Sequence, residues 1–219
     1  MNSLGWLVAF EGIDATGKST LAPIVSDMLQ ARYGLKSVFV EEFPADYLDG
    51  YLGNLMAIDP LLRLHATLPT PVTQTLVLIG AHAYKYETRI AEALKGNDIV
   101  CVERYMASVL AYQPVFLEPE MSSTIDVLTA WISAIVEILP PPHINVLLTT
   151  ETRELAERIR ARGEWDEANM RLLEVVARRY RDIVVRSSNW LIFDSSHAKP
   201  EQTAQDIAFQ IAIRFQQQS

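Results

Sequence analysis

The sequence has little cysteine, no excess of positive charge and no long apolar run, and each shortage excludes a class of protein. Its single cysteine, Cys101, excludes an internal disulfide framework and a metal site built from four cysteines. No apolar run approaches the roughly 18 residues of a membrane span. The net charge of −8 argues against binding to polymeric nucleic acid or to a membrane. The apolar stretch Leu4–Phe10 is too short for a signal peptide, so we expect a cytoplasmic protein.

The composition that remains is typical of one folded domain. The chain has 219 residues, of which 49% are hydrophobic and 21% charged, and its mean hydropathy is +0.09. Chains of this size bury roughly 70% of their unfolded surface, which supports a single hydrophobic core that needs no disulfide or metal ion to stabilise it. The disordered and collagen-like classes are excluded by the same composition. With no repeat and no linker in the sequence, we predict a single domain over residues 1–219.

Short apolar segments alternate with helical segments along the chain. Segments rich in Val, Ile and Leu predict strands at 4–11, 36–42, 98–103, 143–150 and 190–194. Apolar residues at helical spacing predict helices at 19–32, 73–94, 106–112, 125–139, 152–162, 167–186 and 202–215. This alternation predicts an α/β fold of three layers, in which helices cover both faces of a five-stranded parallel sheet. The proline-rich stretch 43–71 is predicted to be a loop on the ligand side of that sheet.

The strongest motif is a phosphate-binding loop between the first predicted strand and helix. Residues 12–19, GIDATGKS, match the pattern G-x-x-x-x-G-K-[ST] in the context that the motif requires. Loop amides and the helix N-terminus are expected to surround the phosphates of ATP, with Lys18 on the β- and γ-phosphates and the Ser19 hydroxyl on Mg²⁺. The predicted ATP-binding residues are Gly12, Asp14, Ala15, Thr16, Gly17, Lys18, Ser19 and Thr20. No Asn-Lys-x-Asp segment of a GTPase is present, so a small phosphoryl-transfer kinase of the P-loop NTPase fold is expected.

Two further groups of arginines are placed to contact a phosphoryl group. Arg104 follows a predicted strand at its carboxyl end, which is the ligand side of such a sheet, and a guanidinium can bond two phosphate oxygens at once. Arg158, Arg160 and Arg162 converge on a Gly-Glu break between two predicted helices. Such a break is typical of a lid that closes over a nucleotide and excludes water. We predict an arginine-rich lid at approximately 153–170.

In their order and spacing these segments resemble the thymidylate kinase family of nucleoside monophosphate kinases. The matching stretches are FEGIDATGKST at 10–20, Phe43-Pro44, ERYMASVLAYQ at 103–113, RIRARGE at 158–164 and RRYRDI around Tyr180. The resemblance covers nearly the whole chain. It implies ATP-dependent phosphorylation of a deoxynucleoside 5′-monophosphate, with dTMP the leading candidate, in the presence of Mg²⁺. It also implies a homodimer, whose interface could involve the apolar stripe around Trp131.

The resemblance also implies roles for individual residues. Asp14 approaches the 3′-hydroxyl of the acceptor sugar, Arg104 holds the acceptor phosphate, and Tyr112 crowds the 2′ position and thereby favours a deoxyribose. Glu103 helps Ser19 to place Mg²⁺, although family members usually have aspartate at the position of Glu103. Family members carry a basic residue either in the phosphate loop or in the lid. Because the loop position here is Ala15, the implied catalytic residues are Lys18, Arg104, Arg160 and Arg162.

The pocket for the acceptor base departs from the family pattern. Family members present a Phe that stacks on thymine and, four residues later, an Arg that bonds it. Here Leu78 or Ile79 takes the place of the Phe and His82 or Ala83 that of the Arg. Phe43 and Pro44 complete the implied acceptor site, without the arginine that commonly follows that pair. Loss of a charged donor to a base carbonyl costs ~1.5–3 kcal/mol, enough to alter the preferred base.

Three alternatives stay open from the sequence. Glu103-Arg104 also resembles the deoxynucleoside kinases, which phosphorylate the bare nucleoside and need a carboxylate base; Glu41 or Glu42 would supply it. The altered base pocket is compatible with a kinase for a modified or specialised nucleotide. A noncatalytic nucleotide-binding module would bind ATP and form no ADP with any acceptor.

Overall fold

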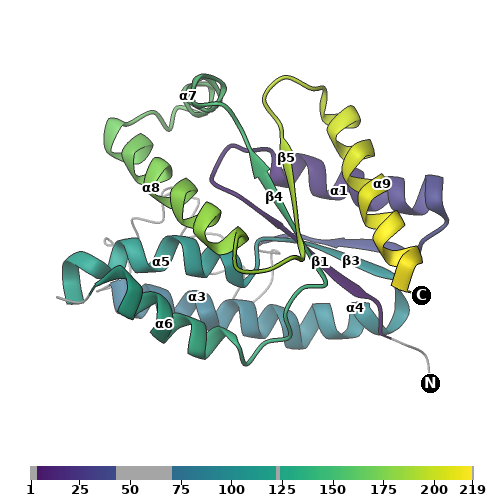
Figure 1. Cartoon of the computed structure of the whole chain (residues 1–219), viewed down its shortest axis with the longest axis horizontal. Helices are drawn as coiled ribbons and strands as arrows, with labels where there is room; N and C mark the ends of the chain where they lie inside the picture. Colours follow the sequence, from purple (N-terminus) through teal and green to yellow (C-terminus); the bar gives the residue numbers. More distant parts are fainter. Residues whose placement is uncertain (1–3, 43–70, 122–123, 219) are drawn as a thin grey trace.

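The fold is built on one parallel sheet. The computed structural model describes residues 4–42, 71–121 and 124–218. Five strands form a sheet in the order β2-β3-β1-β4-β5, and every pairing is parallel (Figure 1). The strands are β1 (Trp6–Glu11), β2 (Ser37–Val40), β3 (Ile99–Glu103), β4 (Ile144–Thr149) and β5 (Trp190–Asp194). The predicted five-stranded parallel sheet is therefore confirmed.

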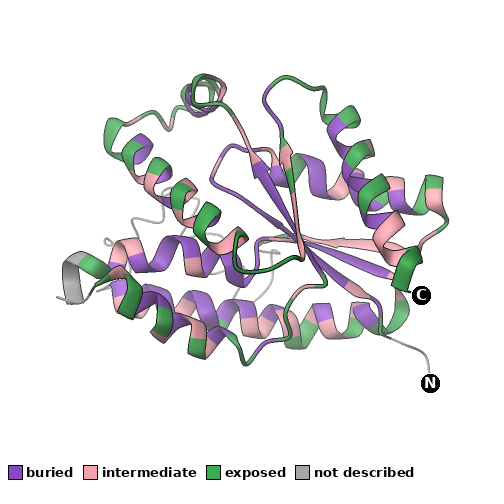
Figure 2. Cartoon of the chain, in the orientation of Figure 1, coloured by how far each residue is buried: buried purple, intermediate pink, exposed green. Residues whose placement is uncertain are grey.

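Helices cover both faces of the sheet, as predicted. They are α1 (Lys18–Tyr33), α3 (Pro71–Lys85), α4 (Ala91–Gly96), α5 (Met106–Met121), α6 (Ile125–Val136), α7 (Thr152–Ala161), α8 (Glu167–Val184) and α9 (Pro200–Gln218). Successive residues of β1 point to opposite faces: Val8 and Phe10 pack against α1 and α9, whereas Leu7 and Ala9 pack in the cluster that includes α5 and α6. Figure 2 shows the buried residues concentrated along the strands and on the helix faces turned toward them.

The predicted lid occupies the carboxyl-terminal side of the strands. Figure 1 shows α7 and the start of α8 together at the top of the molecule. Between these helices the chain turns through Gly163, whose φ of 72° is a left-handed conformation that glycine adopts without strain. An apolar cluster that includes Leu155, Ile159 and Leu173 holds the two helices together. The lid prediction of 153–170 thus falls on α7, the turn and the first residues of α8.

Two helix predictions were partly wrong, one at its end and one in its middle. The helix predicted at 106–112 continues to Met121, although Pro114 removes one backbone donor. The carbonyl of Leu110, four residues earlier, instead accepts a hydrogen bond from Arg179 Nη2 at 3.3 Å, so the proline leaves no unpaired group there. The helix predicted at 73–94 is interrupted by a π-helical turn at Tyr86–Ile90, directly after Lys85.

Among residues 4–42, 71–121 and 124–218, none of the helices combines the length and apolar character needed to cross a bilayer. Cys101 lies fully buried on β3. Burial raises the pKa of its thiol to about 12, so Cys101 packs as a small apolar residue rather than as a reactive thiolate.

Candidate active site

The phosphate-binding loop joins β1 to α1 through a tightly curled backbone. Gly12, Ala15 and Gly17 all have positive φ, of 136°, 61° and 90°. At Gly12 a Cβ atom would lie 2.4 Å from the carbonyl oxygen of Leu148, so only glycine fits. The carbonyl of Ile13 accepts a hydrogen bond from the Thr16 hydroxyl at 2.8 Å, which braces the curl. The loop amides are thereby gathered in front of the N-terminus of α1, as an anion site requires.

Lys18 lies inside this curl at the first turn of α1. Its side chain is buried, and its Nζ donates a hydrogen bond to the carbonyl of Ile13 at 2.8 Å. Burial, together with the charge of Arg104, lowers the pKa of Lys18 to about 8. Ser19 and Thr20 follow on the exposed side of the same turn. The predicted lysine and hydroxyl are therefore brought to one site.

Arg104 forms the second cationic centre, at the carboxyl end of β3. Its φ of 51° is a left-handed conformation that is uncommon for any residue except glycine. The buried guanidinium pairs through Nη2 with Asp14, and its Nε lies 3.2 Å from Glu42 Oε2. Nη1 donates to the carbonyl of Gly12 at 3.1 Å. Arg104 thus contacts two residues in the first half of the phosphate-binding loop, Gly12 and Asp14.

The electrostatics of the site keep Arg104 charged and bring the pKa of the Glu42 carboxyl close to neutral pH. Burial opposes the charge on Arg104, but Asp14 and Glu42 outweigh it and raise the pKa of Arg104 well above its ordinary value. Burial raises the pKa of Glu42 to about 7, although Arg104 pulls in the opposite direction. The site therefore presents a permanent cation beside a carboxyl that titrates near neutral pH.

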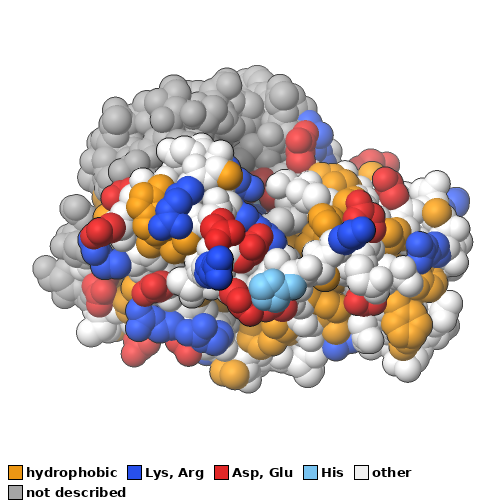
Figure 3. Space-filling view, turned by 90° about the horizontal axis from the view of Figure 1, so that it is seen from above, with side chains coloured by type: hydrophobic (Ala, Val, Ile, Leu, Met, Phe, Trp, Pro, Cys, Tyr) orange, Lys and Arg blue, Asp and Glu red, His pale blue; other side chains and the backbone are white. Residues whose placement is uncertain are grey.

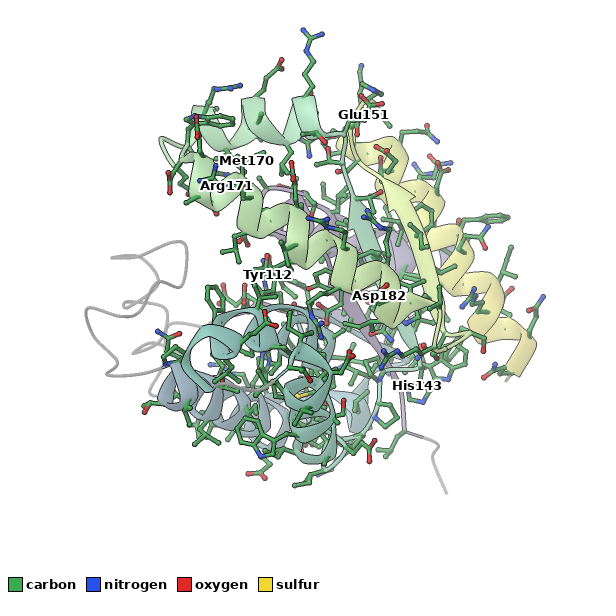
Figure 4. The ribbon with its side chains drawn as sticks, turned by 60° about the vertical axis from the view of Figure 1, so that its left-hand side comes forward. Tyr112, His143, Glu151, Met170, Arg171 and Asp182 are labelled. Carbon is green, nitrogen blue, oxygen red and sulfur yellow. The ribbon has the colours of Figure 1, made fainter. Side chains whose placement is uncertain are left out.

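Tyr112 on α5 closes the side of the Arg104 centre. Its hydroxyl donates to Asp14 Oδ2 at 3.3 Å, and the Arg104 guanidinium lies 5.2 Å from the centre of its ring. Burial, assisted by the charge of Asp14, raises the pKa of Tyr112, so the phenol stays neutral and remains a donor. Figure 4 shows Tyr112 between the ribbons of α8 and α5, well separated from His143, which directly precedes β4.

Lys85 is a buried residue of this region that the sequence reasoning missed. Its Nζ donates to the backbone carbonyls of Glu42 at 3.2 Å, Glu103 at 3.3 Å and Arg104 at 3.3 Å. A cation on three carbonyls fixes the ends of β2 and β3 and stabilises the left-handed turn at Arg104. The available signal was helical spacing, because Lys85 lies seven residues after Leu78 and therefore on the same face of α3.

The lid arginines do not all face the phosphate-binding loop. Arg158 donates to the carbonyl of Ala15 at 3.2 Å and to the carbonyl of Ser195 at 2.6 Å. Arg160 instead lies over the ring of Trp165, 3.7 Å from its centre. Arg162 is four residues after Arg158 and shares its side of the chain, whereas Arg160 lies about 200° around the helix from Arg158. Helical spacing alone would have separated Arg160 from the other two.

A cavity of about 400 Å³ opens between the phosphate-binding loop and the lid. Its size is within the range of small-molecule sites. It is lined by Ala15, Gly17, Thr20, Leu21, Arg158, Ala161, Arg162, Ser195, Ala198, Pro200 and Thr203. Arg162, one of the predicted lid arginines, is therefore at the cavity, together with Ala15, Gly17 and Thr20 of the residues predicted to bind ATP.

The predicted base-pocket residues lie on α3. Ile79 and Ala83 pack into the apolar cluster beneath the sheet, whereas Leu78 and His82 lie buried on the neighbouring face. Burial, with the charges of Lys85 and Arg104, lowers the pKa of His82 well below its ordinary value. Its Nδ1 is buried without a hydrogen-bond partner. His82 is therefore a neutral side chain. Phe43 and Pro44, also predicted at this site, lie outside the described residues.

The predicted magnesium ligands approach the site from separate elements. Ser19 is the second residue of α1, and Glu103 is the partly buried last residue of β3. Within the described part of the chain, no cluster of three or more His, Cys, Asp or Glu residues is present that would hold a metal by itself. Mg²⁺ characteristically takes one or two protein oxygens and completes its shell with substrate phosphates and water. The donor set fits an ion that arrives with a nucleotide.

Positive charge at the site comes from a few individual Lys and Arg residues rather than from a continuous basic surface. Figure 3 views the molecule from the side of α7 and shows Lys and Arg interspersed with Asp and Glu, without a continuous basic patch. This agrees with the net charge of −8. Lys18 and Arg104 are the predicted phosphate-binding cations, and both are buried beside the phosphate-binding loop.

Comparisons with known proteins find thymidylate kinases among the relatives of this chain. The family model of thymidylate kinase matches residues 10–207. A probable thymidylate kinase from Sulfurisphaera tokodaii is 27% identical over 202 residues, which cover 91% of this chain and 93% of the relative. A probable thymidylate kinase 1 from Saccharolobus solfataricus is 24% identical over 92% of this chain and 94% of the relative. A solved thymidylate kinase from Candida albicans superposes with a TM-score of 0.73 at 17% identity, covering 98% of this chain and 94% of that one.

Proposed function

Because this chain belongs to the thymidylate kinase family of nucleoside monophosphate kinases, we propose that it transfers the γ-phosphoryl group of ATP to the 5′-phosphate of dTMP at the site formed by Lys18 and Arg104. The observation that carries the proposal is that both cations bond carbonyls of one short loop. Lys18 Nζ donates to Ile13 and Arg104 Nη1 to Gly12. Two anions bound at these centres would lie side by side, as a donor and an acceptor must.

The donor ATP is assigned to the phosphate-binding loop and the adjoining cavity. The loop amides and Lys18 would hold the β- and γ-phosphates, and the adenosine would extend into the cavity of about 400 Å³ beside Arg158 and Arg162. Ser19 and Glu103 are the residues that would hold Mg²⁺. When bound, the ion would neutralise charge on the phosphate oxygens as the transfer proceeds.

The acceptor is assigned to the opposite side of the loop. Arg104 would bond the 5′-phosphate through the guanidinium edge that now pairs with Asp14 and Glu42. Asp14 would then accept a hydrogen bond from the sugar 3′-hydroxyl, and Tyr112 would exclude a 2′-hydroxyl. The 5′-phosphate is already an anion at neutral pH, so the transfer needs no protein base. Orientation and charge neutralisation supply the catalysis.

The thymine ring is assigned to the face of α3 that carries Leu78 and His82. Leu78 would contact the flat side of the ring. The neutral imidazole of His82 would approach its edge as an uncharged hydrogen-bonding group. The comparisons do not favour a deoxynucleoside kinase or a noncatalytic module, since the relatives found are thymidylate kinases.

We also propose a cytoplasmic homodimer. The unpaired, buried Cys101 is compatible with a reducing compartment. Exposed apolar side chains on two helices that both pack against α5, Leu76 on α3 and Val127 on α6, offer part of a subunit contact. Sedimentation equilibrium is the direct measurement of this assembly, and a mass of one chain at micromolar concentration would contradict it.

A coupled assay of ADP release tests the reaction itself. We expect ADP to form with dTMP as the acceptor and not with free thymidine, because Arg104 is assigned to a phosphate. The same assay with dUMP, dCMP, dGMP and dAMP measures how far the uncharged His82 relaxes base selection. ADP release that is equal with and without any acceptor would contradict a monophosphate kinase.

Arg162, the predicted lid arginine that lines the cavity, is expected to contribute to ATP binding. Replacing Arg162 with alanine should raise the KM for ATP about fivefold, the loss of one exposed charge-assisted contact. The KM for dTMP should stay unchanged. Arg153→Ala is the matched control, because Arg153 is on α7, is 89% exposed and pairs with Glu157. Equal KM values for ATP in both variants would remove Arg162 from the donor site.

The lowered pKa of Lys18 predicts an alkaline limit to ATP capture. Below a pH of about 8 the free enzyme carries Lys18 as a cation, and above it as a neutral amine that cannot attract phosphate. We therefore expect kcat/KM for ATP to fall as pH rises through about 8. In Lys18→Arg, whose guanidinium stays charged, the decline should move beyond pH ~10 even if overall activity is lower. A profile that is flat to pH ~10 in the wild type would contradict the assignment.

A further inference from the structure

Glu11 is a fully buried carboxyl that the proposed reaction does not use. It is the last residue of β1 and directly precedes the phosphate-binding loop. Its Oε1 accepts the backbone N–H of Tyr105 at 2.9 Å. Its Oε2 accepts the hydroxyl of Ser108 at 2.5 Å and the hydroxyl of Tyr180 at 3.1 Å. A buried carboxyl with this many donors is held in one orientation.

Ser108 connects this carboxyl to the acceptor-site arginine. Arg104 Nη1 donates to Ser108 Oγ at 3.2 Å, and the hydroxyls of Ser108 and Tyr180 lie 2.8 Å apart. A serine hydroxyl has one proton to donate. Because the short contact to Glu11 uses that proton, the lone pairs of Ser108 face Arg104 and Tyr180, and the single Tyr180 proton is shared between Ser108 and Glu11. The orientation of the Ser108 hydroxyl is thus set by Glu11.

This contact fixes which edge of the guanidinium faces the ligand. Nη1 of Arg104 is occupied by two acceptors, the carbonyl of Gly12 and the hydroxyl of Ser108. Nη2 and Nε are thereby turned toward Asp14 and Glu42, on the side assigned to the acceptor phosphate. A planar guanidinium that is anchored at one end cannot rotate to present another edge.

We propose that Glu11 and Tyr180 are positioning residues for Arg104, acting through the hydroxyl of Ser108. The inference rests on the proposed function, in which Arg104 binds the acceptor phosphate. Tyr180 belongs to α8, the helix that follows the lid turn, so the acceptor-site arginine is tied by side-chain hydrogen bonds to the lid-bearing part of the chain. Burial raises the pKa of Glu11, and the hydrogen bonds from its donors and the charge of Arg104 offset part of that rise.

A merely structural network would behave differently. Buried hydrogen bonds stabilise the fold, and their loss lowers the melting temperature irrespective of substrate. A positioning network changes the affinity for the ligand of Arg104 and leaves the affinity for the other substrate unaltered. The ratio of the two KM values therefore separates the two roles.

The test is Tyr180→Phe, which removes one hydroxyl and keeps the ring. We expect the KM for dTMP to rise about fivefold to tenfold, the effect of one buried hydrogen bond, with the KM for ATP within about twofold of the wild-type value. Tyr105→Phe is the matched control. Tyr105 is equally buried, but its hydroxyl donates to the carbonyl of Pro140 at 3.1 Å and does not contact Arg104. Both KM values should be unchanged in that control.

Ser108→Ala provides the second arm, since it removes the bridge itself. We expect the same selective rise in the KM for dTMP, and no further rise when Tyr180→Phe is added to it. Additive effects, or a Tyr180→Phe enzyme with a lower melting temperature and an unchanged KM for dTMP, would overturn the inference. Failure of the proposed function is distinguishable, because the wild-type enzyme would then form no ADP in response to dTMP.

Discussion

Replacing Lys18 with alanine is expected to lower kcat/KM for ATP on the order of 10³-fold, the effect of removing one preorganised charge from a transferring phosphoryl group. The reason is its position inside the phosphate-binding loop, where its Nζ lies 2.8 Å from the carbonyl of Ile13. A cation there is withheld from water and acts on the phosphates at full strength. Steady-state kinetics at saturating dTMP is the measurement.

The fold should survive this substitution. Burial disfavours the charged form of Lys18, so its removal also removes a desolvation cost, and the melting temperature should stay within a few degrees of wild type. Lys36→Ala, at an exposed lysine before β2, is the control for loss of a positive charge. Turnover of Lys18→Ala near the wild-type rate would show that the loop is not the donor site.

Arg104→Lys is expected to raise the KM for dTMP at least about a hundredfold and to lower kcat as well, since a lysine retains the charge but cannot make bidentate contacts. In the wild type the Arg104 guanidinium bonds Gly12 and Ser108 while it faces Asp14 and Glu42. An ammonium group cannot satisfy these directions together. The KM for ATP should change little, because Lys18 and the loop amides hold the donor.

Arg104→Met separates this effect from stability. It leaves Asp14 and Glu42 without their cation, and removal of one partner from a buried ion pair costs ~3–5 kcal/mol of unfolding free energy. We expect a clear drop in melting temperature for Arg104→Met and a much smaller one for Arg104→Lys. Similar melting temperatures for these variants and the wild type, with unchanged KM for dTMP, would contradict the role of Arg104.

The sheet could be predicted from local sequence because its strands are buried on both faces. An apolar run such as 98–103 predicts a strand without knowledge of its neighbours in the sheet. The phosphate-binding loop can likewise be predicted from its own short sequence between the first strand and the first helix. The end of α5 could not be predicted in this way. Pro114 is accommodated because Arg179, which is 69 residues distant from Leu110 in sequence, donates to the carbonyl that the proline leaves free.

The candidate site also combines residues that local sequence predicts with residues that only tertiary packing brings together. The positions of Lys18 and Arg104 follow from a motif and a strand end, which are local features. Lys85 and Tyr180 were missed as parts of the site because their contacts with neighbouring elements arise only when α3 and α8 pack against them. Of the predicted arginine pair, Arg162 reached the cavity and Arg160 lies against Trp165, which is the consequence of helix periodicity.

The central claim is that Lys18 and Arg104 hold two phosphate groups at one loop, side by side. Isothermal titration with a bisubstrate analogue, in which adenosine and thymidine are joined through five phosphates, tests it most directly. We predict one analogue per chain, binding at least about a hundredfold more tightly than ATP, with that advantage lost in both Lys18→Ala and Arg104→Lys. An analogue that binds no more tightly than ATP, or that is indifferent to Arg104→Lys, would contradict the account.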